Sequence, residues 1–154
     1  MRGRLRLLAA GVIALSGCAS APPRAEEPRP PGRGRVEVTV TGFKSEKGQA
    51  LVALFLSARG WPNDQAAAFG RAVLPIREGQ AVATFEDVPA GPFAVSAFHD
   101  DDDDRVLDTG LFGIPSEDFG FSRDARGMFG PPRFEAARLD LAVGETKRVT
   151  IRVE

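Results

Sequence analysis

The chain has 154 residues, of which 43% are hydrophobic and 27% charged, and its formal net charge is −1. This length suits one globular domain, and a near-neutral charge gives no sign of nucleic-acid binding. The single cysteine excludes an intrachain disulfide and any metal site built from several cysteines.

The first 17 residues have the pattern of a secretory signal. Three arginines in MRGRLR precede the apolar run LLAAGVIALSG, which is too short to span a membrane stably. The run ends in LSGC at residues 15–18, which resembles the bacterial lipobox. Residues 1–17 are therefore predicted to be a lipoprotein signal peptide, and Cys18 to carry the lipid. Removing the three arginines from the 20 basic residues leaves 17 against 21 acidic residues, so the mature chain is mildly acidic.

The residue after Cys18 is alanine rather than aspartate, which favours the outer membrane. We expect a lipid-anchored protein of the bacterial cell envelope that faces the periplasm. Residues 18–34 hold the lipidated cysteine and a tether rich in proline and charge, without any apolar period. The folded domain is expected over residues 35–154.

Seven segments of this domain have the apolar patterns of strands. Residues 36–40 alternate with period two, and residues 50–56 are apolar throughout, as in a strand buried on both faces. After the second of these segments, and before the next strand, Asn63 or Asp64 is placed to cap a short helix. The other five strands are predicted at residues 71–76, 80–88, 93–99, 135–141 and 147–153.

These elements predict an all-β protein, a single antiparallel β-sandwich of about seven strands. A long irregular loop, rich in glycine and proline, is predicted at residues 100–133. The strand-turn-strand segment FEDVPAGPFAVSAF at residues 85–98 is similar to the transthyretin-like and carboxypeptidase-regulatory sandwiches. This similarity supports an immunoglobulin/transthyretin-like arrangement.

The segments around the long loop resemble one bacterial family more closely. They are His99-Asp100, Asp108, GIPSE at 113–117, GFS at 120–122 and PRFEAA at 132–137. Together they are similar to the bacterial domain of unknown function 2141 family, over most of residues 36–153. The resemblance implies a secreted or envelope β-sandwich and implies no particular reaction.

The stretch HDDDDDRVLD, which ends at Asp108, has the ligand spacing of an EF-hand-like calcium loop. Side chains at alternate positions of such a loop turn inward, and a backbone carbonyl adds a further oxygen. Its ligand positions 1, 3, 5, 7 and 9 fall on Asp100, Asp102, Asp104, the carbonyl of Val106, and Asp108.

Two positions depart from this calcium-loop pattern. Position 6 is Arg105, where glycine normally permits the sharp turn, and position 12 is Leu111, where a bidentate glutamate normally lies. Glu117 or another loop residue could replace that glutamate. The predicted cofactor is therefore calcium, bound weakly with a dissociation constant on the order of 10⁻⁴ to 10⁻³ M. The alternative is a solvated acidic turn without metal.

A candidate binding loop overlaps this stretch. The aromatic side chains could line a groove for a glycan, a peptide or an apolar ligand, or they could pack against each other across one end of the sandwich. Loop aromatics usually bury themselves, which favours the second interpretation. The residues are His99, Phe112, Glu117, Phe119, Phe121 and Phe129.

The sequence contains no recognisable catalytic constellation, so we expect no enzyme activity. No serine lies in a Gly-x-Ser-x-Gly elbow, and His99 ends a strand, where loop hydrogen bonding is expected. The predicted role is a non-catalytic binding or structural module, a monomeric domain with an unknown protein or glycan partner. One alternative is an accessory subunit of an envelope complex. Another is a small hydrolase acting on glycan or peptide through carboxylates among Glu117, Asp118, Glu135 and Asp108.

Overall fold

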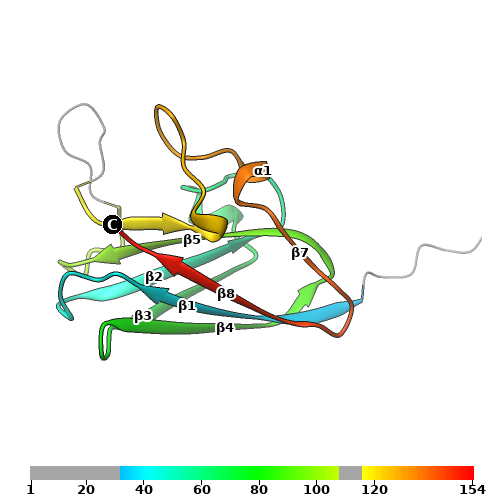
Figure 1. The fold of residues 1–154 in the computed structure, drawn as a ribbon, viewed down its shortest axis with the longest axis horizontal. Helices are drawn as coiled ribbons and strands as arrows, with labels where there is room; N and C mark the ends of the chain where they lie inside the picture. Colours follow the sequence, from blue (N-terminus) through cyan, green and yellow to red (C-terminus); the bar gives the residue numbers. More distant parts are fainter. Residues whose placement is uncertain (1–31, 108–115) are drawn as a thin grey trace, which may run out of the picture.

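The computed structural model describes residues 32–107 and 116–154. Within these residues, eight strands form two sheets (Figure 1). The first sheet has the order β4-β1-β8, with β1 (Arg33–Thr41), β4 (Gln80–Pro89) and β8 (Thr146–Arg152). The second has the order β3-β2-β5-β6, with β2 (Gln49–Phe55), β3 (Gly70–Pro75), β5 (Gly91–Asp100) and β6 (Phe119–Phe121). Strand β7 (Leu139–Leu141) pairs with the start of β5.

The two sheets pack face to face and enclose one apolar core, so the predicted all-β sandwich is confirmed. Alternate side chains of each strand turn inward. On β1 these are Val36, Val38 and Val40, and they are fully buried against inward-facing residues of the second sheet such as Leu54 and Val95.

One strand pair differs from the antiparallel pattern. Strand β8 runs parallel to β1, with Val38 opposite Val149, while the other strand pairs are antiparallel. The physical reason lies in the connection: the chain reaches β8 from β7, which belongs to the other sheet. A crossover between sheets lets two strands run in the same direction, whereas a tight hairpin does not.

Two segments differ from the expected elements after β5. The segment expected as one strand at residues 135–141 begins as a single helical turn, α1 (Phe134–Ala137), and only its end forms β7. The long loop contains β6 and a 3₁₀ helix at Ser122–Asp124. In Figure 1, β6, α1 and the segment between them lie together on the upper side of the sheets.

The short helix expected after β2 is present. It is a 3₁₀ helix at Gln65–Ala67, and the Asp64 carboxylate caps it by accepting a hydrogen bond from the amide of Ala66. Across the described ranges, no helix is long and apolar enough to cross a membrane.

The outer face of the second sheet, which points away from the core, carries a continuous apolar row. The strand register aligns Val73 of β3, Leu51 of β2, Phe98 of β5 and Phe119 of β6. We call these four side chains the apolar row. A second row beside it consists of Arg71, Ala53, Ser96 and Phe121.

An aromatic cluster covers one end of this outer face. The Trp61 ring lies edge-on to Phe55 and Phe134, and its indole N–H donates a hydrogen bond to the carbonyl of Pro132 at 2.8 Å. The cluster fixes the segment after β2 and the segment before α1 onto the sheet, and Phe119 is the one member of the apolar row that packs against it.

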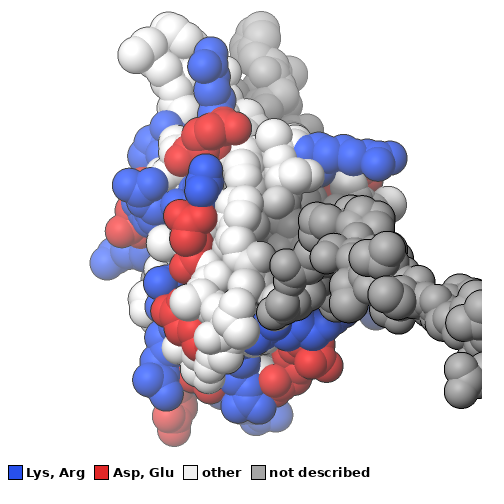
Figure 2. Space-filling model, turned by 90° about the vertical axis from the view of Figure 1, so that its right-hand side faces the viewer, with Lys and Arg blue, Asp and Glu red and all other residues white. Residues whose placement is uncertain are grey.

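The surface charges of the domain are mixed. On the face shown in Figure 2, basic and acidic side chains are interspersed rather than separated by sign.

Candidate functional site

His99 and Asp100 are adjacent at the end of β5, and the strand pleat turns their side chains to opposite faces. The His99 ring is buried. Its Nε2 donates to the carbonyl of Lys47 at 2.8 Å, and its edge contacts the Phe43 ring at 5.3 Å between centroids. His99 therefore stabilises the turn before β2 and takes no part in the acidic group on the other face.

The Asp100 side chain is fully buried and accepts several hydrogen bonds. The Gln49 amide nitrogen lies 2.7 Å from its carboxylate, the amide of Arg105 lies at 3.0 Å, and the amide of Asp104 at 3.1 Å. Burial by itself raises the pKa of Asp100, but these donors, together with the amide of Asp103, outweigh it and hold the pKa below its ordinary value. The carboxylate is thus ionised at neutral pH.

The turn that follows Asp100 requires unusual backbone angles. Asp103 has φ +67° and Arg105 has φ +65°, the left-handed region that glycine adopts most easily. Arg105 occupies the position at which the calcium-loop pattern normally has glycine. The sharp turn thus forms with the residues present, at a cost in strain of about 1–2 kcal/mol for each.

Gly48, in the turn before β2, allows residues 100–107, which we call the acidic loop, to approach β2. Gly48 has φ +73°, and a Cβ atom there would lie only 2.1 Å from the carbonyl oxygen of Asp100. Any side chain at this position would displace the end of β5. The position therefore requires glycine for two reasons, its backbone angle and its close packing.

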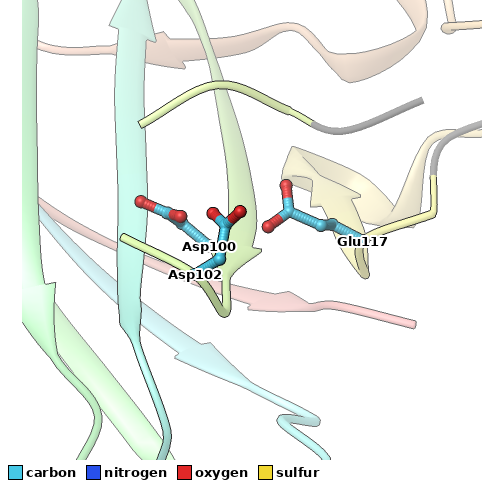
Figure 3. A group of neighbouring side chains, drawn as sticks. All are labelled: Asp100, Asp102 and Glu117. Atoms are coloured by element: carbon cyan, nitrogen blue, oxygen red, sulfur yellow. The ribbon is translucent and has the colours of Figure 1, made fainter. Parts of the chain in front are cut away.

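Three carboxylates lie close together, those of Asp100 and Asp102 at the start of the acidic loop and that of Glu117 from the segment before β6. One oxygen from each lies within 4.8 Å of the others. Figure 3 shows Glu117 reaching toward the two aspartates from the segment before β6. Asp102 and Asp100 are two of the residues predicted from the calcium-loop spacing, and Glu117 is the predicted substitute for the missing glutamate.

Each of these carboxylates is held in place by the backbone of the loop. Asp102 accepts a hydrogen bond from the amide of Asp104, and Glu117 accepts one from the amide of Asp101 at 3.1 Å. An ionised carboxylate offers about four lone-pair sites, so it can accept a backbone hydrogen bond and bind a cation at the same time. Hard oxygen ligands of this kind suit calcium or magnesium.

The carboxylate of Asp104, another predicted ligand, does not belong to this group. The Asp104 carboxylate instead accepts a hydrogen bond from the amide of Val106 at 2.7 Å, which closes the next turn of the loop. Asp108 lies outside the described residues, as do the predicted lipidation site Cys18 and the loop residue Phe112.

The aromatic residues of the candidate binding loop are separated in the structure. Phe121 is buried and Phe119 half-buried beside it, with ring centroids 5.6 Å apart, and both pack near Trp61. Phe129 lies at an exposed turn, where 98% of its surface is accessible. Phe119 and Phe121 thus adopt the self-packed arrangement, and Phe129 does not.

The carboxylates considered for hydrolysis also have separate surroundings. Asp118 forms an ion pair with Lys44, and its backbone carbonyl accepts a hydrogen bond from the amide of His99. Glu135 is exposed in the first turn of α1. Neither belongs to the group around Glu117.

Gln49 and Gly48 are two site residues that the sequence does not single out. Both reach Asp100 through the pairing of β2 with β5, in which Gln49 lies opposite Asp100, 51 residues further along the chain. A glycine immediately before an apolar strand is a usable signal for a tight turn, but nothing local predicts which loop packs against it.

A family model described as "Uncharacterized protein conserved in bacteria (DUF2141)" matches residues 38–150. No curated protein and no solved structure matches the chain.

Proposed function

The chain belongs to the DUF2141 family of bacteria, and from this premise we propose that it is an envelope lipoprotein whose sandwich acts as a non-catalytic binding module, stabilised by calcium. The anchor at Cys18 attaches the domain to the outer membrane on its periplasmic side. The observation that carries the calcium assignment is the convergence of Asp100, Asp102 and Glu117, whose oxygens lie within 4.8 Å of one another.

Electrostatics supports a cation at this group. Three carboxylates at such short separations repel one another, and the repulsion is strongest where burial limits screening by water. A divalent cation would relieve it. The low pKa of Asp100 means that this ligand is already ionised and requires no proton loss before it binds.

The non-catalytic role is supported by the engagement of the candidate catalytic groups. His99 is occupied by the Lys47 carbonyl and the Phe43 ring, and Asp118 is paired with Lys44. A general base has to reach the proton that it removes, and these side chains are instead used to hold turns and strands together.

The test is thermal unfolding of the purified full chain with and without calcium. A dissociation constant near a millimolar or below implies a stabilisation of about 1–3 kcal/mol at about 10 mM calcium, which is a rise of several degrees in Tm. Magnesium should give a smaller rise, because it needs tighter octahedral geometry and retains its waters.

Two variants of the same loop make the test specific. Asp102→Asn removes a proposed ligand. Asp101→Asn removes an equal charge from the adjacent exposed residue, whose backbone amide donates a hydrogen bond to Glu117 but whose carboxylate is not part of the group. The calcium response should disappear in the first and persist in the second. Equal responses in both variants, or no response in the wild type, would reject the calcium assignment.

A further inference from the structure

A groove lies on the outer face of the second sheet, with the apolar row as its floor. Its volume is about 750 Å³, which is within the range of small-molecule sites, roughly 300–1,000 Å³. Val73 in this floor keeps 45% of its surface exposed, although it sits on a strand beside buried Leu51. Phe98 and Phe119 are half-buried, so the floor is partly exposed. An apolar ligand that displaces water from these exposed surfaces gains free energy.

Two segments wall the groove. On one side are Pro62, Asn63 and Gln65, which follow the aromatic cluster. On the other are Arg105, Val106 and Leu107, the last described residues of the acidic loop. The first wall is fixed by the packing of Trp61, and the second by the hydrogen bond from the amide of Arg105 to buried Asp100. Both walls are thus tied to buried groups before any ligand binds.

The charge inside the groove is opposite to that of the acidic loop beside it. Of the described residues that line it, only Arg71 and Arg105 are charged. Neither guanidinium has an ion pair or a side-chain hydrogen bond within the described part of the chain. In a chain with 21 acidic residues, two unpaired arginines over an apolar floor form a site complementary to an anion with an apolar body. The planar fork of arginine matches a carboxylate well.

We propose that this groove binds a single long acyl chain that ends in a carboxylate. The chain lies along the apolar row, and the carboxylate is held by Arg71, Arg105 or both. This inference rests on the proposal that the domain binds a ligand without converting it, and it names the ligand class and the surface. The proposed calcium group lies at the end of β5 and is a separate site.

The test uses a diazirine-bearing palmitic acid, crosslinked by light to the purified full chain in the presence of EDTA so that calcium cannot precipitate the acid. Labelled peptides are then mapped by mass spectrometry. Labels should fall on the strands and walls of the groove, and unlabelled palmitate should compete with the probe. Hexadecanol, which has the same chain without the charge, should compete about tenfold more weakly, because a hydrogen-bonded charge is lost.

Matched variants distinguish specific binding in the groove from nonspecific binding of the probe to the protein surface. Val73→Asp places a charge on the floor, and Val82→Asp places the same charge on an exposed position of β4, in the other sheet. Arg71→Gln with Arg105→Gln removes the cations, and Arg77→Gln removes one exposed cation outside the groove lining. Labelling should fall about tenfold in Val73→Asp and in the double arginine variant, and remain unchanged in the two controls.

Each result bears on the inference. Absent labelling, labelling scattered over both sheets, or equal loss in Val73→Asp and Val82→Asp would overturn it. Equal competition by palmitate and hexadecanol, or an unaffected double arginine variant, would overturn the carboxylate assignment. A calcium response in the melting curve without groove labelling would reject this inference alone. Labelling without a calcium response would reject the calcium site alone, and chemically altered probe would reject the non-catalytic role.

Discussion

Gln49 and Asp100 face each other across β2 and β5, and the Gln49 amide nitrogen lies 2.7 Å from the Asp100 carboxylate. This bond ties the first residue of the acidic loop to the sheet and not merely to other loop residues. The loop geometry therefore depends on strand register, and changes in Asp100 should be felt in the stability of the whole sandwich.

Asp100→Asn should lower the free energy of unfolding at neutral pH by about 1.5–3 kcal/mol, because hydrogen bonds to a charged acceptor are lost. The pKa of Asp100 is depressed in the folded state. Its contribution is thus present above the unfolded pKa, about 4, and is lost as the pH falls through the lower folded value. The difference between wild type and variant should shrink on acidification in urea unfolding series. A difference that stays constant with pH would show that the charge of Asp100 contributes nothing.

Arg105→Gly should stabilise the domain by up to about 1 kcal/mol, because glycine removes the strain of a positive φ while giving up some entropy in the unfolded chain. Asp101→Gly is the control in the same loop, since Asp101 is not among the residues with positive φ. It should destabilise by about 0.4–1 kcal/mol. Chemical denaturation measures both. Destabilisation by Arg105→Gly would show that its side chain supports the loop more than its backbone angle strains it.

Trp61→Ala should lower the free energy of unfolding by about 2–4 kcal/mol, somewhat less than for a fully buried tryptophan. It removes the contacts with Phe55 and Phe134 and the hydrogen bond to Pro132. Phe129→Ala truncates an aromatic residue that is almost fully exposed and should change stability by less than about 0.5 kcal/mol. A similar loss in both variants would mean that the exposed turn packs in solution.

Cys18→Ala should leave the precursor uncleaved and without lipid label when cells are fed a radioactive fatty acid. The predicted signal and lipobox at residues 1–18 motivate this expectation. Ser20→Ala, two residues further on, serves as the control and should be processed normally. Acylation of the Cys18→Ala variant would reject the anchor.

Much of the sandwich could be predicted because the apolar pattern of each strand indicates which of its faces are buried. Residues 50–56 are apolar on both faces, and β2 occupies Gln49–Phe55. Residues 36–40 alternate, and the valines of β1 line the core. The family membership also follows from motifs that stand in the sequence itself.

The remaining elements could not be predicted, because distant contacts define them. Strand β6 has only three residues and is a strand because β5 pairs with it. The same holds for the site. Asp100 and Asp102 follow from spacing along the chain, whereas Gln49 and the groove over β2, β3 and β5 exist only once the strands are in register.

The parallel pairing of β1 with β8 joins the first strand of the domain to its last, and the Glu37–Arg148 contact between them closes a sequence separation of 111 residues. Contacts of such high order slow folding, since much of the loop entropy is lost before they form. While β8 is still being synthesised, β1 has one unpaired edge and its valines lack part of their cover. This topology delays closure of the core until nearly the whole of the described domain, from β1 to β8, is available.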